Sequence, residues 1–186
     1  STGEIIDARV THLEPFGAFV DVGCGIISLL SIDCISVSRI SHPRDRFYSG
    51  MFIKTAVKAV DRSLMRISVT HKELLGTWRE NAEKFCAGQT VSGIVRSIEP
   101  YGIFIELTPN LAGLAEYSEN VRIGDRATVY IKNIIPEKMK IKLVLIDACR
   151  CDRELYPPEY FICSDSIESW KYSPEECPKY IGTEFR

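Results

Sequence analysis

Two short segments of this 186-residue chain carry aromatic residues at a spacing suited to binding flat rings. One reads "EPFGAFVDV" and the other "EPYGIFIEL", so Phe16 and Phe19 in the first correspond to Tyr101 and Phe104 in the second. An aromatic side chain stacks on an unpaired nucleic-acid base with about 1–3 kcal/mol and little preference for sequence. The segments therefore predict two stacking platforms for single-stranded nucleic acid.

Stacked bases bring their phosphates with them, and those phosphates need cations nearby. Arg66 in "RISVT", together with Lys140 and Lys142 in "KMKIKL", are the candidate phosphate ligands. A simpler interpretation stays open for both groups. The aromatics could be partly buried in their own domain, and the cations could be solvated strand ends that keep a sheet edge unpaired.

The aromatic segments must be β-strands if their rings are to reach solvent. Side chains alternate between the two faces of a strand, so Phe19 and Asp21 share one face and the small apolar residues between them share the other. Since a carboxylate is not buried without a partner, we expect the Asp21 face to be the solvent face. Phe104 and Glu106 repeat the pattern. Gly17, between the two aromatics, could form a bulge that brings Phe16 to the same side as Phe19.

Alternating or β-branched runs bounded by Gly, Pro and Asp predict five short strands in each half of the chain. A closed barrel removes the exposed edges of so small a sheet. The longest connection lies between the third and fourth strands, as in the Greek-key barrel of the oligonucleotide/oligosaccharide-binding (OB) type. We therefore predict an all-β fold with two five-stranded OB barrels. The expected strands are Ile5–Leu13, Gly17–Val22, Ile26–Leu30, Phe52–Asp61, Arg66–Thr70, Thr90–Ile98, Gly102–Leu107, Ala112–Ala115, Arg126–Ile135 and Met139–Leu145.

The domain boundaries follow from this repeat. Barrels are expected over residues 1–70 and 88–147, and residues 71–87 are expected to form a helical linker. Thr70 and Glu73 make a capping box there, and the apolar residues that follow recur with a helical period. The aromatic-rich extension over residues 148–186 has no counterpart in the repeat. Its apolar content is too high for disorder, and we expect a mostly irregular chain packed on the second barrel.

Composition excludes several classes of function. With 23 Lys and Arg against 25 Asp and Glu, the net charge of −2 argues against a strongly basic coat, so any polyanion site is local. No catalytic or phosphate-cradling motif is present. We therefore expect no enzyme activity, no cofactor and no small-molecule substrate. Without a signal peptide or an apolar run of membrane-spanning length, we expect a cytoplasmic protein with no membrane partner.

The seven cysteines include no C-x-x-C pair. Four of them lie in the extension, and their C-x-C start and long gaps depart from common structural zinc spacings. We expect no metal site and instead predict buried free thiols at Cys149, Cys151, Cys163 and Cys177. The chain begins at Ser1 rather than at an initiator Met, which leaves open a processed product or a piece of a longer protein.

The two halves resemble the S1 domain, a family named for ribosomal protein S1 and also found in polynucleotide phosphorylase and ribonuclease E. "GEIIDARVTHLEPFGAFVDV", "SLLSI" and "AVDRSLMRISVT" carry the resemblance in the first half, and "GQTVSGIVRSIEPYGIFIEL", "LAGLAEYS" and "IKNIIPEKMKIKL" carry it in the second. The resemblance covers about residues 3–70 and 88–145. Its most specific part is the Phe/Tyr-Gly-x-Phe turn at a fixed distance from the Arg-Ile-Ser segment.

The resemblance implies a barrel that binds single-stranded RNA across its second and third strands. Carried over by position, it implies stacking on Phe16 and Phe19 with Asp61 and Arg66 as polar partners. In the second half it implies stacking on Tyr101 and Phe104, with Lys140 in the place of Arg66. The chain departs from the family at Ser31 and Glu116, where a His is common, and Ile135 replaces the acidic residue. Because Glu116 would repel a phosphate, we expect the second platform to be weaker.

Three functions remain open from the sequence. The favoured one is a non-catalytic, single-stranded RNA-binding protein similar to ribosomal protein S1, acting in translation or messenger-RNA handling. The second is a scaffold whose barrels contact the ribosome or another protein instead of RNA. The third is an accessory domain of a longer nuclease.

Overall fold

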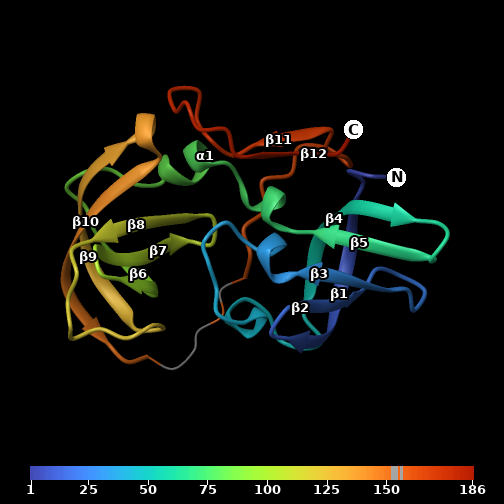
Figure 1. Ribbon diagram of the computed structural model, residues 1–186, viewed down its shortest axis with the longest axis horizontal. Helices are drawn as coiled ribbons and strands as arrows, with labels where there is room; N and C mark the ends of the chain where they lie inside the picture. The colour runs from blue at the N-terminus through green and yellow to red at the C-terminus, as the bar shows by residue number, and fades with distance from the viewer. Residues whose placement is uncertain (152–154, 156) are drawn as a thin grey trace. The chain divides into compact units, whose positions relative to one another are not determined.

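The computed structural model describes residues 1–151, 155 and 157–186, and it divides the chain into two compact units. The first unit combines Ser1–Gly76 with Leu155–Lys171 and Gly182–Arg186. The second combines Thr77–Glu154 with Tyr172–Ile181. Each unit contains one closed five-stranded barrel, so the predicted all-β fold with two OB-type barrels is confirmed (Figure 1).

The first barrel closes in the order β1-β2-β3-β5-β4 (Figure 1, blue to green). All its neighbours are antiparallel except β3 and β5, which pair in parallel. Alternate residues point inward, and Val10, Val20 and Leu30 are completely buried. The strands are β1 Ile5–Glu14, β2 Gly17–Asp21, β3 Ile27–Ser31, β4 Phe52–Asp61 and β5 Arg66–Thr70.

The long connection between β3 and β4 contributes to the core of the first barrel. It contains two short 3₁₀ helices, Ile32–Cys34 and Pro43–Asp45. Ile35 and Phe47 from this connection are buried in the same apolar cluster as the inward residues of the strands. The connection is therefore held by packing.

The second barrel repeats this plan in the order β10-β8-β7-β6-β9 (Figure 1, green to orange). Here β8 and β10 are the parallel pair. Val95, Ile105 and Ile131 are completely buried, which places the inward set of each strand as the alternation predicts. The strands are β6 Thr90–Glu99, β7 Gly102–Thr108, β8 Leu111–Ala115, β9 Arg126–Ile135 and β10 Lys140–Cys149, and a 3₁₀ turn, Pro136–Lys138, precedes β10.

The predicted helix between the barrels is confirmed, but it is much shorter than the expected linker over residues 71–87. The segment forms a 3₁₀ turn, Lys72–Leu75, and a short helix α1, Trp78–Ala82. Gly76 interrupts them with φ 92° and ψ 160°, a conformation outside the helical region that glycine adopts readily. The capping box lies at Thr77 and Glu80 instead of at Thr70 and Glu73, because the helix begins about two turns later than the apolar pattern suggests.

The extension is not packed only on the second barrel. Its segments Leu155–Lys171 and Gly182–Arg186 belong to the first unit, and only Tyr172–Ile181 belongs to the second. It also contains a small antiparallel pair, β11 Ser169–Lys171 with β12 Gly182–Glu184. Its apolar side chains belong to both units. The sequence could not show which barrel each of them packs on. Residues 152–154 and Tyr156 of the extension lie outside the described residues.

Candidate nucleic-acid interface

Phe16 and Phe19 form an edge-to-face pair on the outer surface of the first barrel. Their ring centroids are 6.0 Å apart and the ring planes meet at 88°. Phe16 is 55% exposed and Phe19 is half-buried. The structure therefore brings the two sequence-predicted aromatics together, with one ring lying on the strand and the other standing at its start.

The glycine between the two aromatics acts by close approach and not by a bulge. A Cβ on Gly17 would lie 2.4 Å from the carbonyl oxygen of Leu30 on β3. Only glycine lets β2 and β3 come this close. The bulge is in β1 instead, where the pairing with β2 shifts between Val10 and His12. The same holds at Gly102, where a Cβ would lie 2.6 Å from the carbonyl oxygen of Ala115.

Strand register places Arg66 on the same outer surface as the first aromatic pair. Phe19 pairs with Leu29 on β3, and Leu29 pairs with Ser68 on β5. Arg66 is two residues before Ser68 on β5, so its side chain leaves the same face of the sheet. It is exposed and stands opposite Asp61 on β4. A flexible cation at this position can reach a phosphate next to a base on Phe19.

Asp61 is committed to its own turn. Its Oδ1 accepts the Ser63 hydroxyl at 2.7 Å and the Leu64 backbone N–H at 3.0 Å. The Ser63 hydroxyl is the main reason why the pKa of Asp61 lies below its ordinary value, and Arg66 contributes less. This geometry favours a role in shaping the β4–β5 turn that presents Arg66.

His12 belongs to this surface, although no sequence motif indicated it. Its ring lies nearly parallel to that of Phe19, at 28° and 6.2 Å between centroids. Its Nε2 is 2.7 Å from Oε1 of Glu14. Its partner on β2 is Phe19, because the bulge in β1 shifts the pairing by one residue. Three rings thus gather on the first barrel.

Tyr101 and Phe104 reproduce the first pair on the second barrel. Their centroids are 6.1 Å apart and their planes meet at 84°. Tyr101 is 68% exposed and Phe104 is half-buried. Two sequences that differ at most positions therefore fold into the same aromatic arrangement, which makes it a property of the turn.

One cation of the second barrel lies in the same strand row as its aromatic pair. Phe104 pairs with Leu114 on β8, and Leu114 pairs with Lys142 on β10. Lys142 therefore occupies the position that Ser68 has in the first barrel. Lys140, at the start of β10, occupies the position of Arg66. Both predicted lysines are on the surface that carries Phe104.

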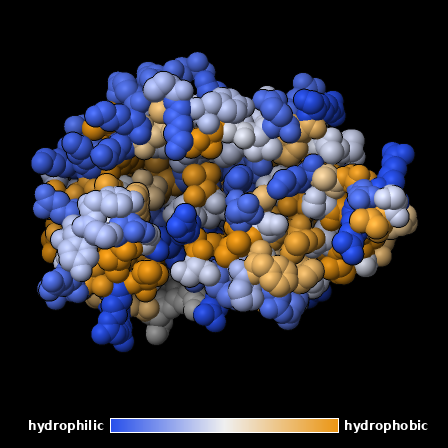
Figure 2. Space-filling model, viewed as in Figure 1, coloured by the Kyte–Doolittle hydropathy of each residue, from blue (hydrophilic) through white to orange (hydrophobic). Residues whose placement is uncertain are grey.

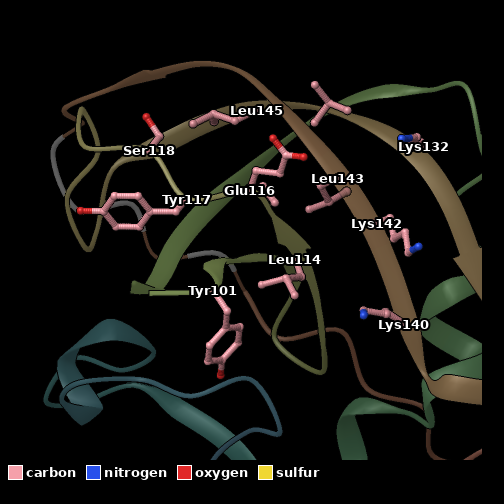
Figure 3. A pocket seen from close by; sticks show the side chains of 12 residues that line it. Tyr101, Leu114, Glu116, Tyr117, Ser118, Lys132, Lys140, Lys142, Leu143 and Leu145 are labelled. Atoms are coloured by element: carbon pink, nitrogen blue, oxygen red, sulfur yellow. The ribbon is translucent and has the colours of Figure 1, made fainter. Parts of the chain in front are cut away.

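A groove of about 530 Å³ runs along this surface (Figure 3). Tyr101 and Leu114 form part of its lining, and the side chains of Lys140 and Lys142 extend from β10 (Figure 3). Lys132 of β9, which no sequence motif indicated, also contributes. Glu116 lies in the same groove, so the predicted carboxylate is present but shares the groove with three lysines. With three lysines and one glutamate in its lining, the groove carries a net positive charge, which favours an anionic ligand.

The alternation predicted that Glu106 faces solvent beside Phe104, and this prediction is wrong. Glu106 is 6% exposed and forms an ion pair with Arg96, whose Nε is 3.2 Å from Oε1. Arg96 is also almost fully buried, at 8%. A carboxylate can be buried when a guanidinium satisfies it, and the sequence pattern could not show this partner on β6.

Apolar and hydrophilic side chains are mixed on the face of the molecule that Figure 2 shows. Figure 2 shows orange side chains over the region of β1–β3 of the first barrel, with hydrophilic side chains among them. This mixture suits a ligand that has both flat apolar bases and charged phosphates. Among the described residues, no group of three or more His, Cys, Asp and Glu side chains could hold a metal ion. Of the extension's thiols, Cys177 is buried as predicted, but Cys149, Cys151 and Cys163 are exposed.

The comparison with known families decides the class of the first barrel. Residues 1–72 match the sequence profile of the S1 RNA binding domain. The chain carries tandem S1 domains. The S1 resemblance seen in the sequence is thus confirmed, and the second barrel repeats the strand order and aromatic pair of the first.

Relatives of these S1 domains include ribosomal proteins. "Small ribosomal subunit protein bS1" of Leuconostoc lactis is 33% identical over 155 residues, covering 77% of this chain and 36% of the relative. The "bS1 homolog" of Bacillus subtilis (strain 168) is 34% identical over 148 residues, covering 78% and 37%. The chain thus spans about a third of the length of these curated relatives.

A solved structure gives a weaker likeness. The "multidomain protein with nucleic acid binding domains" from Streptococcus pneumoniae is 19% identical, with a TM-score of 0.35. The match covers 77% of this chain and 51% of that one. Among the described residues, no helix is long and apolar enough to cross a membrane.

Proposed function

We propose that this chain is a non-catalytic, single-stranded RNA-binding region that acts in translation or messenger-RNA handling in the cytoplasm, as its likeness to ribosomal protein S1 suggests. The observation that carries the proposal is the duplicated edge-to-face aromatic pair, each on the outer surface of an S1 barrel and each near cations. Bases stack on Phe19 and Phe104, while Arg66 and the groove lysines neutralise the phosphates.

The two platforms are proposed to differ in what they contribute. The first has three rings, His12, Phe16 and Phe19, and a cation at the edge of the surface. The second has two rings and a groove that includes three lysines. We expect stacking to dominate at the first and phosphate contacts at the second. One RNA strand that reaches both sites gains affinity through effective concentration.

The test is fluorescence anisotropy with single-stranded RNA, single-stranded DNA and duplex RNA at two salt concentrations. We expect single-stranded RNA to bind with an affinity that falls as salt rises. Phe19→Ala and Phe104→Ala should each weaken binding by about five-fold to a hundred-fold, the loss of one stacked base. Ile123→Ala, which removes an exposed apolar side chain from the connection between β8 and β9, is the control.

The second candidate function is a protein-docking scaffold, for example at the ribosome. Exposed apolar side chains at the β4–β5 turn favour it, because Leu64 is 60% and Met65 is 88% exposed beside Arg66. The same experiment separates the two functions. Absence of RNA binding in the micromolar range, or binding that neither Phe variant changes, would reject the RNA proposal and support the docking function.

A further inference from the structure

A surface on the first barrel, away from the aromatic pair, combines an exposed ring with a guanidinium. Phe52, the first residue of β4, is 78% exposed. The Cζ atom of Arg9, on β1, lies 5.6 Å from the centroid of the Phe52 ring. Tyr48, 57% exposed, precedes Phe52 in the connection from β3. We name Arg9, Tyr48 and Phe52 the flank site.

The flank site is held in a fixed arrangement by the backbone. The N–H of Gly50 donates to the carbonyl of Val10 at 2.6 Å, and the N–H of Val10 donates to the carbonyl of Met51 at 2.8 Å. These bonds fasten the turn between Tyr48 and Phe52 to β1. The Nε of Arg9 donates to the carbonyl of Gly50 at 3.4 Å, which aims the guanidinium along the turn.

The charge of Arg9 is available to a ligand. Its neighbour across the strands is Asp21, but the Asp21 carboxylate accepts the backbone N–H of Gly23 at 2.8 Å. Arg9 forms no ion pair with any residue that the structure describes, whereas the nearby Lys54 is paired with Asp7 at 2.8 Å. An exposed guanidinium lying near an aromatic ring keeps donors free for a phosphate.

The second barrel lacks this arrangement. The residue that pairs with the first residue of β9, Arg126, is Ile94 on β6. In the first barrel the corresponding pair is Phe52 with Arg9. The aromatic residue is therefore absent from the second barrel at this position, which argues that the ring is not a requirement of the fold.

The flank site lies within reach of an RNA strand bound to the first aromatic pair. Arg9 is three residues from His12 along β1, or about 10 Å at about 3.3 Å per residue. Phe52 is two strands from Phe19, because β1 separates β4 from β2. A single strand that leaves the ring of Phe19 can cross β1 and reach Phe52 within a few nucleotides.

We propose that the flank site is a second RNA-binding subsite of the first barrel, in which a base stacks on Phe52 or Tyr48 and Arg9 binds the adjacent phosphate. The inference rests on the proposed RNA-binding function and extends it to a longer RNA segment. Single-stranded RNA fits better than a protein partner, because the site places exposed rings beside a guanidinium that has no carboxylate partner among the described residues.

The test uses the whole chain and two labelled RNAs, of about 4 and about 12 nucleotides, within the range of lengths bound by single OB barrels. We expect Phe52→Ala and Arg9→Ala each to weaken binding of the longer RNA by about five-fold or more and to leave the shorter one unchanged. Arg9→Lys should restore only part of the affinity, because it keeps the charge but not the planar group.

Phe19→Ala and Ile123→Ala are the comparison variants, and thermal unfolding checks that every variant folds. Phe19→Ala should weaken both RNAs, and Ile123→Ala neither. Equal affinities of parent and Phe52→Ala for the longer RNA would overturn the flank site, as would an equal loss for both RNAs. If the parent binds neither RNA, the proposed function itself fails. If Phe52→Ala binds the longer RNA as tightly as the parent does while Phe19→Ala weakens binding, only the flank site fails.

Discussion

The imidazole of His71 and the hydroxyl of Tyr160 are joined by a hydrogen bond of 3.0 Å across 89 residues of sequence. The Tyr160 oxygen also accepts the backbone N–H of Lys54 at 3.1 Å. Nδ1 of His71 lies 2.7 Å from the carbonyl of Ile35, which can only accept, so Nδ1 carries the proton and Nε2 accepts the Tyr160 hydroxyl. This chain of bonds ties the extension to the first barrel.

Removing the Tyr160 hydroxyl should therefore destabilise the first unit. Tyr160→Phe leaves Nε2 of the fully buried His71 without its partner, and a buried unsatisfied group costs about 1–3 kcal/mol. Urea unfolding measures the free energy. Tyr117→Phe, at an exposed tyrosine, is the control and should change it by less than about 0.5 kcal/mol. Equal stabilities of Tyr160→Phe and the parent would show that the bond contributes nothing.

The stability of the protein should fall in mild acid because of His71. Burial is the main cause that lowers the pKa of His71 to about 4, from an ordinary value of 6.5. The unfolded chain takes up a proton near pH 6.5, and the folded protein does so only near pH 4. The free energy of unfolding is therefore highest above pH 6.5 and is lost as the pH falls towards 4. We expect a loss of about 2 kcal/mol between pH 7 and pH 5.

Urea unfolding at a series of pH values checks this dependence. His71→Gln removes the titrating ring and should flatten the curve in the same interval, whatever its effect on absolute stability. A parent curve that is flat from pH 7 to pH 5 would contradict the buried, neutral His71.

The buried ion pair of the second barrel should be sensitive to the loss of either partner. Glu106→Gln leaves the charge of Arg96 buried without its counter-ion, and the expected cost is about 3–5 kcal/mol. Arg79→Met breaks the pair with Glu176, in which both side chains are 44% exposed, and should cost less than about 1 kcal/mol. Calorimetry measures the loss of stability in both variants. A similar loss in the two would refute the prediction that the buried pair matters more than the exposed one.

Gly17 should tolerate no side chain without loss of both stability and RNA affinity. The methyl group of Gly17→Ala would meet the carbonyl of Leu30 at 2.4 Å and push β2 away from β3. Such overpacking costs about 1–3 kcal/mol and displaces Phe16 and Phe19. Pro15→Ala, at the exposed neighbouring residue, is the control. Parent-like RNA binding by a folded Gly17→Ala protein would show that the aromatic pair does not need a glycine at this position.

The salt dependence of RNA binding should report the lysines of the second groove. Lys142→Ala removes the cation in the strand row of Phe104, and the slope of log affinity against log salt should fall by about 1. Lys179→Ala, in the extension, should leave the slope unchanged. Anisotropy titrations at several salt concentrations give the slopes, and an unchanged slope for Lys142→Ala would place the phosphates elsewhere.

The local features of this protein could be predicted well from the sequence. The five strands of each barrel follow from period-two alternation and from Gly, Pro and Asp at their ends, because these signals act between neighbouring residues. The aromatic pairs were identified for the same reason, since Phe16 before β2 and Phe19 on β2 are only three residues apart. The glycine was placed correctly, but its physical role was not, because the carbonyl that it faces belongs to β3.

The sequence by itself thus determined the two barrels, their strands and the aromatic residues that each presents. The tertiary structure alone decided which cations share a row with those rings, because the parallel pairing of β8 and β10 joins Phe104 to Lys142 through Leu114. It also decided that Glu106 is buried on Arg96 and that Tyr160 packs on His71. Register and packing depend on contacts between distant segments, which no local pattern records.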